Sequence, residues 1–331
     1  MRTIDQTTDQ DGRSQAATAR GRAAHVALGT IPLPRSSAAA ARAGSTPRQV
    51  TAVPAAASTG VAALLRGPVR RAQVIASTPT GVYLHVPGER DGDVVGVLTS
   101  DAARLPLGCV LFRPSTGRPL VPPTATAEVG GGRVVVGHLA VSAAAWWDPR
   151  PRLPSARPAL LPEGVRQLRS TLYGEGVPHS AFELPGLPTG PGGPLAALRG
   201  AVRRADLDAA LRTASRLIGL GPGLTPAGDD VMAGTVAGLV LLGHPAAPRF
   251  AAGVTALAAC RTTELSRALL RHAAAGRVSG EYAAVLHALV GERPLAPTVD
   301  ALLAPGSTGN RATALGLCTA IDLVERTTRT R

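Results

Sequence analysis

The most informative absence in this chain is lysine: all 35 of its basic side chains are arginine. The chain therefore has no Schiff-base lysine, no P-loop lysine and no lysine general base. Aromatic residues make up only 2% of the sequence, and no zinc-finger, helix-turn-helix or RNA-binding motif occurs. Such a chain lacks the stacking platforms of single-strand binders, so we expect no nucleic-acid partner.

Cysteine and histidine are scarce in any arrangement that would hold a metal. Cys109, Cys260 and Cys318 form no Cys-x-x-Cys pair, which argues against a disulfide scaffold or a thiolate zinc site. Free thiols favour a reducing compartment, and we expect a cytoplasmic protein. His272 is the best of the seven histidines for direct chemistry, although its place in a last helical turn is equally explained by the helix dipole. No apolar run reaches the roughly 20 residues that cross a bilayer, so no membrane partner is expected.

Acidic residues are missing from one long stretch. Between Asp11 and Glu89 there are nine arginines and no carboxylate, and this stretch holds much of the net charge of +13. Residues 1–55 show no hydrophobic period, so we expect a disordered tail. A basic balance suits nucleic acid or an anionic ligand, and its location in a tail weighs against nucleic acid.

Hydrophobic patterning divides the rest of the chain into a β-rich part and a helical part. Short β-branched runs predict strands within 69–75, 82–86, 94–99, 110–113 and 133–139. Residues 148–194 are rich in proline and glycine and predict an irregular connection with one short helix near 164–173. Ala/Leu periodicity then predicts helices within 195–204, 207–217, 226–242, 247–260, 262–275, 281–290 and 311–327. The predicted fold class is α+β, with a small β-rich N-terminal domain (56–147) followed by an all-helical C-terminal domain (195–331).

Residues 219–243 are the stretch most typical of a binding site. Their first part is a loop in which glycines permit backbone conformations and close approaches that a Cβ would block. Thr225 followed by proline is a strong helix start. Gly234 and Gly238 lie one and two turns after Asp230 and predict a groove for another backbone or a ligand.

Asp229 and Asp230 fall in the first turn of the helix predicted after this loop. A helix dipole needs only one carboxylate, so an adjacent pair indicates ligand, metal or proton chemistry. Both are our candidate catalytic residues, with Asp230 playing the larger part. They are also the candidate ligands for Mg²⁺, the one cofactor that the pair suggests.

A second glycine-rich loop, residues 305–310, also precedes a predicted helix. Helix N-termini present free N–H groups to anions, so two such loops predict a site for a small anionic substrate. Arg261 or Arg311 would supply a bidentate partner for a carboxylate or phosphate. Each Ser or Thr taken alone is explained more simply by helix capping. The candidate substrate-binding residues are Gly221, Gly223, Thr225, Gly228, Thr263, Ser266, Ser307, Thr308, Gly309 and Asn310.

The string Gly-Leu-Thr-Pro-Ala-Gly-Asp-Asp at residues 223–230 closely resembles the signature of the AllH-like family, a subunit type of oxamate carbamoyltransferase. Residues 261–266 are similar to the family's Thr/Ser helix, and residues 306–309 are similar to its C-terminal Gly-Ser loop. Similar pieces at Gly67-Pro68-Val69 and at residues 146–149 extend the resemblance over roughly residues 60–327.

The resemblance implies carbamoyl transfer between carbamoyl phosphate and oxamate, or oxalurate phosphorolysis in reverse, in purine and allantoin catabolism. It also implies that the other carbamoyltransferase subunits are partners of this chain in a multi-subunit enzyme. The residues alone indicate an anion-binding enzyme or enzyme subunit with an acidic pair. Asn310 and Arg311 stand where the family pattern has a carboxylate. This departure favours an alternative, a non-catalytic ligand-sensing or assembly protein of the same fold that binds a small carboxylate or phosphate.

Overall fold

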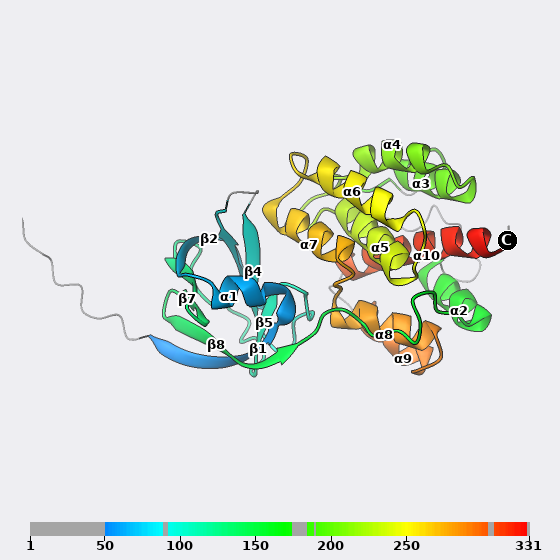
Figure 1. Cartoon of the computed structure of the whole chain (residues 1–331). Helices are drawn as coiled ribbons and strands as arrows, with labels where there is room; N and C mark the ends of the chain where they lie inside the picture. The colour runs from blue at the N-terminus through cyan, green and yellow to red at the C-terminus, as the bar shows by residue number, and fades with distance from the viewer. Residues whose placement is uncertain (1–49, 89–91, 174–183, 189, 304–307, 330–331) are drawn as a thin grey trace, which may run out of the picture. The chain divides into compact units, whose positions relative to one another are not determined.

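The computed structural model describes residues 50–88, 92–173, 184–188, 190–303 and 308–329 (Figure 1). Residues from Pro47 to the C-terminus form one compact unit. The predicted tail lies outside the described residues up to residue 49, and so does Ser307. No helix in the described part of the chain is long and apolar enough to cross a membrane.

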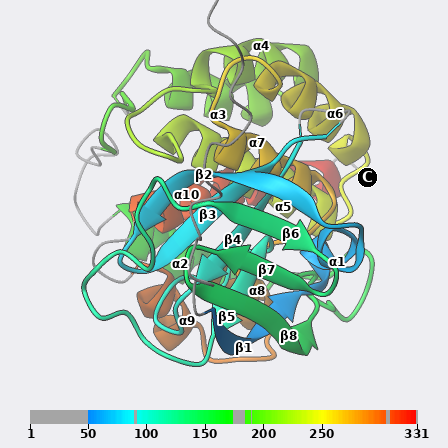
Figure 2. The same ribbon diagram turned by 90° about the vertical axis from the view of Figure 1, so that its left-hand side faces the viewer.

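Eight strands form a closed barrel in the order β1-β5-β4-β3-β2-β6-β7-β8 (Figure 2). The pairs β1–β8 and β4–β5 are parallel, and the other six pairs are antiparallel. The inward side chains are mainly valine and leucine, whose shapes pack well on a pleated surface. The strands are β1 Thr51–Ser58, β2 Arg70–Thr78, β3 Gly81–Val86, β4 Asp93–Leu98, β5 Gly108–Leu111, β6 Ala127–Gly130, β7 Arg133–Val136 and β8 Leu139–Trp147.

The run predicted as one strand over residues 133–139 is two strands, β7 and β8, joined by a turn. Gly137 in that turn has a φ of +56°, a left-handed conformation that favours glycine. Val134 and Val141 pair across the hairpin and both are buried. The valine run therefore predicted strand structure, whereas the position of the turn depended on one glycine.

Helices occupy most of the chain after the barrel, and one short helix lies between β1 and β2. The central helix is α5, which is hydrophobic all round and packs against α4, α6, α7 and α10. The helices are α1 Ala62–Arg66, preceded by the 3-10 turn η1 Thr59–Val61, then α2 Pro162–Tyr173, α3 Pro194–Arg203, α4 Leu207–Leu217, α5 Ala227–Leu241, α6 Ala247–Ala258, α7 Glu264–Ala274, α8 Gly280–Leu289, α9 Leu295–Leu302 and α10 Thr308–Arg329.

The glycines of α5 and α10 let these two helices meet backbone to backbone. A Cβ on Gly234 would lie 2.0 Å from the carbonyl oxygen of Thr313, and one on Gly316 would lie 2.1 Å from that of Val231. Atoms this close overlap, so only glycine permits the contact. The groove predicted along Gly234 and Gly238 is therefore filled by α10.

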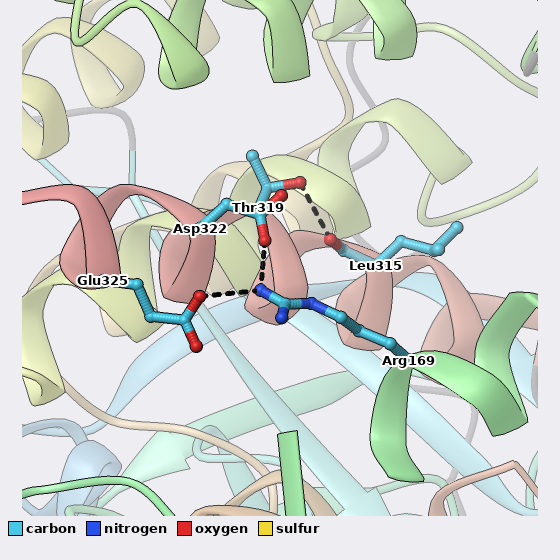
Figure 3. A network of polar contacts seen from close by, with 5 residues as sticks. All are labelled: Arg169, Leu315, Thr319, Asp322 and Glu325. Atoms are coloured by element: carbon cyan, nitrogen blue, oxygen red, sulfur yellow. Dashed lines mark hydrogen bonds and ion pairs between the residues drawn. The ribbon is translucent and has the colours of Figure 1, made fainter. Parts of the chain in front are cut away.

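Helix α10 is also joined to α2 by an ionic network (Figure 3). Arg169 of α2 donates to the carboxylate of Asp322 and, at 3.3 Å, to that of Glu325. These carboxylates oppose the effect of burial and raise the pKa of the Arg169 guanidinium. The network holds α2, which arrives from the proline-rich connection, against the helix that packs on α5.

The predicted fold class was wrong. The β-rich part is a closed barrel rather than a small domain ahead of a separate helical one, and its hydrophobic core includes Leu265 and Ala268 of α7. The barrel and the helices belong to one compact unit. Helix α7 supplies apolar side chains that the short strands lack, so the barrel core is completed from outside the β-rich sequence.

Strand β1 shows why local sequence patterns did not predict the closure of the barrel. It begins at Thr51, inside the stretch expected to be disordered, and its alanines and Pro54 have low strand propensity. Pairing with β8 along its whole length, and with β5 over Ala55–Ala57, holds it in the sheet. Long-range hydrogen bonding, rather than local preference, makes this segment a strand.

Candidate functional site

A cavity of about 320 Å³ lies between one end of the barrel and the helical part. This volume is at the lower end of the range for small-molecule sites. Among the described residues that line it, only Asp230 and Arg277 carry charged groups. The barrel contributes Thr78, Thr80, Tyr83, Leu105 and Pro106, and the polar residues of the helical part are Thr225, Asp230, Arg277, Ser279, Tyr282, Asn310 and Thr313.

The glycine loop before α5 shapes the start of that helix. Gly221 and Gly223 have φ values of +120° and +97°, and a Cβ on Gly228 would lie 2.0 Å from the carbonyl oxygen of Leu217. The loop therefore turns sharply and packs against the end of α4. Among the predicted substrate-binding glycines, these three position the loop, and the described cavity lining does not include them.

Asp229 has both carboxylate oxygens engaged. Its Oδ1 accepts a 2.8 Å hydrogen bond from the backbone N–H of Gly219, and its Oδ2 accepts one from the hydroxyl of Thr262. Burial raises the pKa of Asp229, and these two hydrogen bonds lower it. Asp229 thus ties the glycine loop to the segment that leads into α7.

Asp230 lies in a different environment, at the cavity. Its side chain is buried, and no described residue is a hydrogen-bond partner of its Oδ2. Burial and the neighbouring charge of Asp229 raise the pKa of Asp230 well above its usual value, and a hydrogen bond with the Thr225 side chain opposes this. A carboxyl group with a raised pKa suits proton transfer near neutral pH.

Gly309, in the first turn of α10, explains how two separate glycine motifs meet. A Cβ on this residue would lie 2.8 Å from Oδ2 of Asp230 and 3.8 Å from Oγ1 of Thr225. Glycine therefore leaves the carboxyl oxygen room beside the start of α10. The structure brings Thr225, Asp230, Gly309 and Asn310 together at the cavity.

The remaining predicted hydroxyl residues are placed differently. Thr263 caps α7, since its Oγ1 accepts from the backbone N–H of Ser266 and donates to the carbonyl oxygen of Leu224 at 2.6 Å. Ser266 is buried one turn later and does not appear in the described lining. Thr308 is the first residue of α10.

The cation at the cavity is Arg277, which the sequence analysis did not select. Arg261 donates to the carbonyl oxygen of Ser215 at 3.0 Å and is exposed, and neither Arg261 nor Arg311 belongs to the described lining. Arg277 follows Gly276, whose φ of +68° ends α7, and precedes Ser279, the N-cap of α8. The sequence signal that could have pointed to Arg277 is a basic residue in the short connection between two predicted helices.

His272 lies near the cavity without lining its described part. Its Nδ1 is buried with no hydrogen-bond partner among the described residues, and its ring packs against Gly60 of the barrel. Burial, Arg277 and Arg271 lower the pKa of His272 to about 4. It is therefore neutral at physiological pH and fits a packing role between α7 and the barrel.

The acidic pair does not fit a two-carboxylate magnesium site. Both oxygens of Asp229 already accept hydrogen bonds, whereas Oδ2 of Asp230 has no hydrogen-bond partner among the described residues. The described residues contain no group of three or more His, Cys, Asp or Glu that could hold a metal ion. Mg²⁺ prefers six oxygen ligands in octahedral geometry, and the hydrogen bonds of Asp229 already occupy both of its carboxylate oxygens.

Comparison with known families gives one match. The family model described as oxamate carbamoyltransferase subunit AllH matches residues 217–321, which confirms the resemblance inferred from residues 223–230. The matched range holds Asp230, Arg277 and Asn310, whereas the barrel and its cavity wall lie outside it. No curated protein and no solved structure matches the chain.

Proposed function

We propose that this chain is a subunit of a carbamoyltransferase of the oxamate carbamoyltransferase type and that the cavity at Asp230 is its substrate site. The family match over residues 217–321 supports the reaction class. The observation that carries the site is the buried, unpartnered Oδ2 of Asp230 at a cavity, with Gly309 leaving it space. A buried carboxyl oxygen without a partner is costly unless a ligand uses it.

In the proposed reaction the amide nitrogen of oxamate attacks the carbonyl carbon of carbamoyl phosphate. A C–N bond forms, the C–O bond to phosphorus-bound oxygen breaks, inorganic phosphate leaves and the amide nitrogen loses a proton. Ionised Asp230 accepts that proton. In the reverse direction, phosphate attacks the ureide carbonyl of oxalurate, and protonated Asp230 returns the proton to the departing amide nitrogen.

The other polar groups of the cavity suit substrate binding. Arg277 provides the positive charge for a small anionic substrate, and Asn310 adds an amide at the start of α10. The free N–H groups of a helix N-terminus favour an anion or a developing negative charge. We propose the other subunits of the carbamoyltransferase as protein partners, without nucleic acid, membrane or bound metal as a requirement.

Activity in the assembled enzyme tests this proposal. The full chain is co-expressed with candidate carbamoyltransferase subunits, and phosphate release from carbamoyl phosphate is measured with and without oxamate. Asp230→Asn is expected to reduce kcat by roughly 100-fold or more, the usual contribution of a general acid or base. Asp208→Asn, which changes an exposed carboxylate in the first turn of α4, is the matched control.

Two outcomes would count against catalysis at this site. Equal kcat for Asp230→Asn and the unchanged enzyme would remove Asp230 from the reaction. If oxamate raises the melting temperature of the chain but no assembly turns it over, the non-catalytic ligand-sensing or assembly role is the better account. Both measurements use the same preparations, so binding and turnover are separated directly.

A further inference from the structure

The cavity lies along two helices, α5 and α7, that run side by side in the same direction. The starts of α5 and α7 are joined through the hydrogen bond between Thr262 and Asp229. Their ends also lie together, since a Cβ on Gly276, just after α7, would lie 3.3 Å from side-chain atoms of Val240 and Leu241. The two helices therefore form a continuous floor.

One face of each helix lines this floor. The lining residues of α5 are Asp230, Ala233 and Ala237, spaced three and four residues apart, so they share a face. Those of α7 are Leu265, Leu269 and Ala273, spaced four residues apart. At 1.5 Å per residue, Asp230 and Ala237 are about 10 Å apart along the α5 axis.

The two ends of the cavity differ in chemistry. At the start of α5 lie Thr225, Asp230 and Asn310, whereas Arg277 follows the last turn of α7 at the other end. Between them the floor is apolar, and alanine at three of its positions leaves open space. Oxamate has two carbons and would occupy only one end.

The barrel supplies a fixed wall opposite this floor. Thr78 ends β2 and Thr80 lies in the β2–β3 turn, where its carbonyl oxygen accepts hydrogen bonds from the backbone N–H and the hydroxyl of Thr99. Tyr83 lies two residues into β3 and lines the cavity from the barrel side. The wall is thus preformed rather than dependent on a ligand.

We propose that the substrate of this site is a monocarboxylate longer than oxamate, with an amide or ureide group at Asp230, several methylene groups along α5 and α7, and its carboxylate at Arg277. This inference rests on the proposed carbamoyl transfer at Asp230 and replaces oxamate by a longer acceptor. Arg277 is the only cation among the described lining residues, so it is the side chain of that lining that can pair with the carboxylate. The apolar section between Asp230 and Arg277 suits methylene groups, because burial of an unpaired charge there is unfavourable.

A series of ω-amide monocarboxylates tests the length directly. Calorimetry with the full chain would compare oxamate, succinamate, glutaramate, adipamate, pimelamate and suberamate, each carrying a terminal primary amide. The dissociation constant is expected to fall by about fourfold for each methylene buried, with the tightest binding among the longest three acids. This part requires no variant, so it does not depend on the folding of a mutant.

Arg277→Gln tests the carboxylate end. It is expected to weaken binding of the best long acid by roughly tenfold or more, while binding of the neutral diamide of the same length stays within about threefold. Arg249→Gln is the matched control, because Arg249 is exposed and pairs with Asp208 away from the cavity.

Each failure has a distinct meaning. If oxamate binds at least as tightly as every longer acid, the length inference is overturned and the proposed carbamoyl transfer to oxamate stands. If no acid of the series binds, both this inference and the proposed substrate site are overturned. Unchanged binding of the long acid to Arg277→Gln would remove Arg277 as the carboxylate partner.

Discussion

The two faces of helix α5 use small residues with opposite results. On one face, Gly234 lies against the backbone of α10, so closely that a Cβ has no room. On the adjoining face, Ala233 and Ala237 border the cavity. A small side chain brings two helix backbones together where the partner helix, here α10, also has small residues at the contact. It leaves a cavity where the opposite wall, here the barrel, is held in place by its own fold. Composition alone does not separate these two uses.

The largest expected effect comes from adding one methyl group to the packed face. Gly234→Ala should reduce the free energy of unfolding by about 3 kcal/mol, because the added Cβ overlaps the carbonyl oxygen of Thr313. Gly200→Ala is the control in α3, where the added Cβ meets only the end of a flexible arginine side chain. That control should gain up to about 1 kcal/mol from helix propensity. Urea unfolding measures both, and similar values for the two variants would contradict the packing account.

A smaller loss is expected for the structural member of the acidic pair. Asp229→Asn should cost about 1–3 kcal/mol, because an amide cannot accept at both positions that Gly219 and Thr262 now use. Asp208→Asn, at an exposed carboxylate, should stay within about 0.5 kcal/mol. A stability of Asp229→Asn equal to that of the control would show that the tie between the glycine loop and α7 is unimportant.

The stability effect of Asp230→Asn is expected to be opposite in sign to that of Asp229→Asn, and it should depend on pH. The folded-state pKa of Asp230 is raised by burial and by Asp229, so above the unfolded pKa the native state binds more protons than the unfolded state. Stability contributed by the neutral carboxyl is then lost as pH rises from about 4 to the folded pKa. Asp230→Asn removes this loss, so the melting temperature of the variant should fall less over that range. Parallel pH profiles for both proteins would refute the raised pKa.

The smallest stability change is expected on the cavity face, one residue from Gly234. Ala233→Leu adds three carbons to a helix position that faces open space, so the free energy of unfolding should change by about 0.5 kcal/mol or less. Binding of the long amide acids should nevertheless be lost, because the leucine fills their path. Strong destabilisation would mean that the space beside Ala233 closes in solution.

Local patterns predicted helices α3 to α8 and most of the strands, since these segments have the period of their final structure. They failed for β1, whose alanines acquire strand geometry only by pairing with β8, for β8 beyond its first residue, and for α1, β6 and α9. They also failed for the fold class, because the contribution of Leu265 and Ala268 to the barrel core is a tertiary contact with no local signature.

The lining of the candidate cavity was predicted in part, for the same reason. The motif around Asp230 was readable because glycine, threonine and adjacent carboxylates at a helix start form an unusual cluster. Arg277 and Tyr83 come from a short connection and from a strand, and only the folded chain brings them to the same cavity. From the sequence we expected Asp230 to play the larger part of the pair, and the hydrogen bonds of Asp229 now assign that residue a structural role.

The closure of the barrel sets an order of events for a chain made from its N-terminus. Thr51 pairs with Leu139, so the edge of β1 that faces β8 stays unpaired until the last strand has been synthesised. At that stage the core of the barrel still lacks Leu265 and Ala268, which are synthesised later as part of α7. Contacts this distant in sequence form slowly, so the helices nucleate faster than the barrel closes. A ribosome-bound chain that ends before residue 265 would therefore present an unfinished apolar barrel surface, a natural binding site for a chaperone.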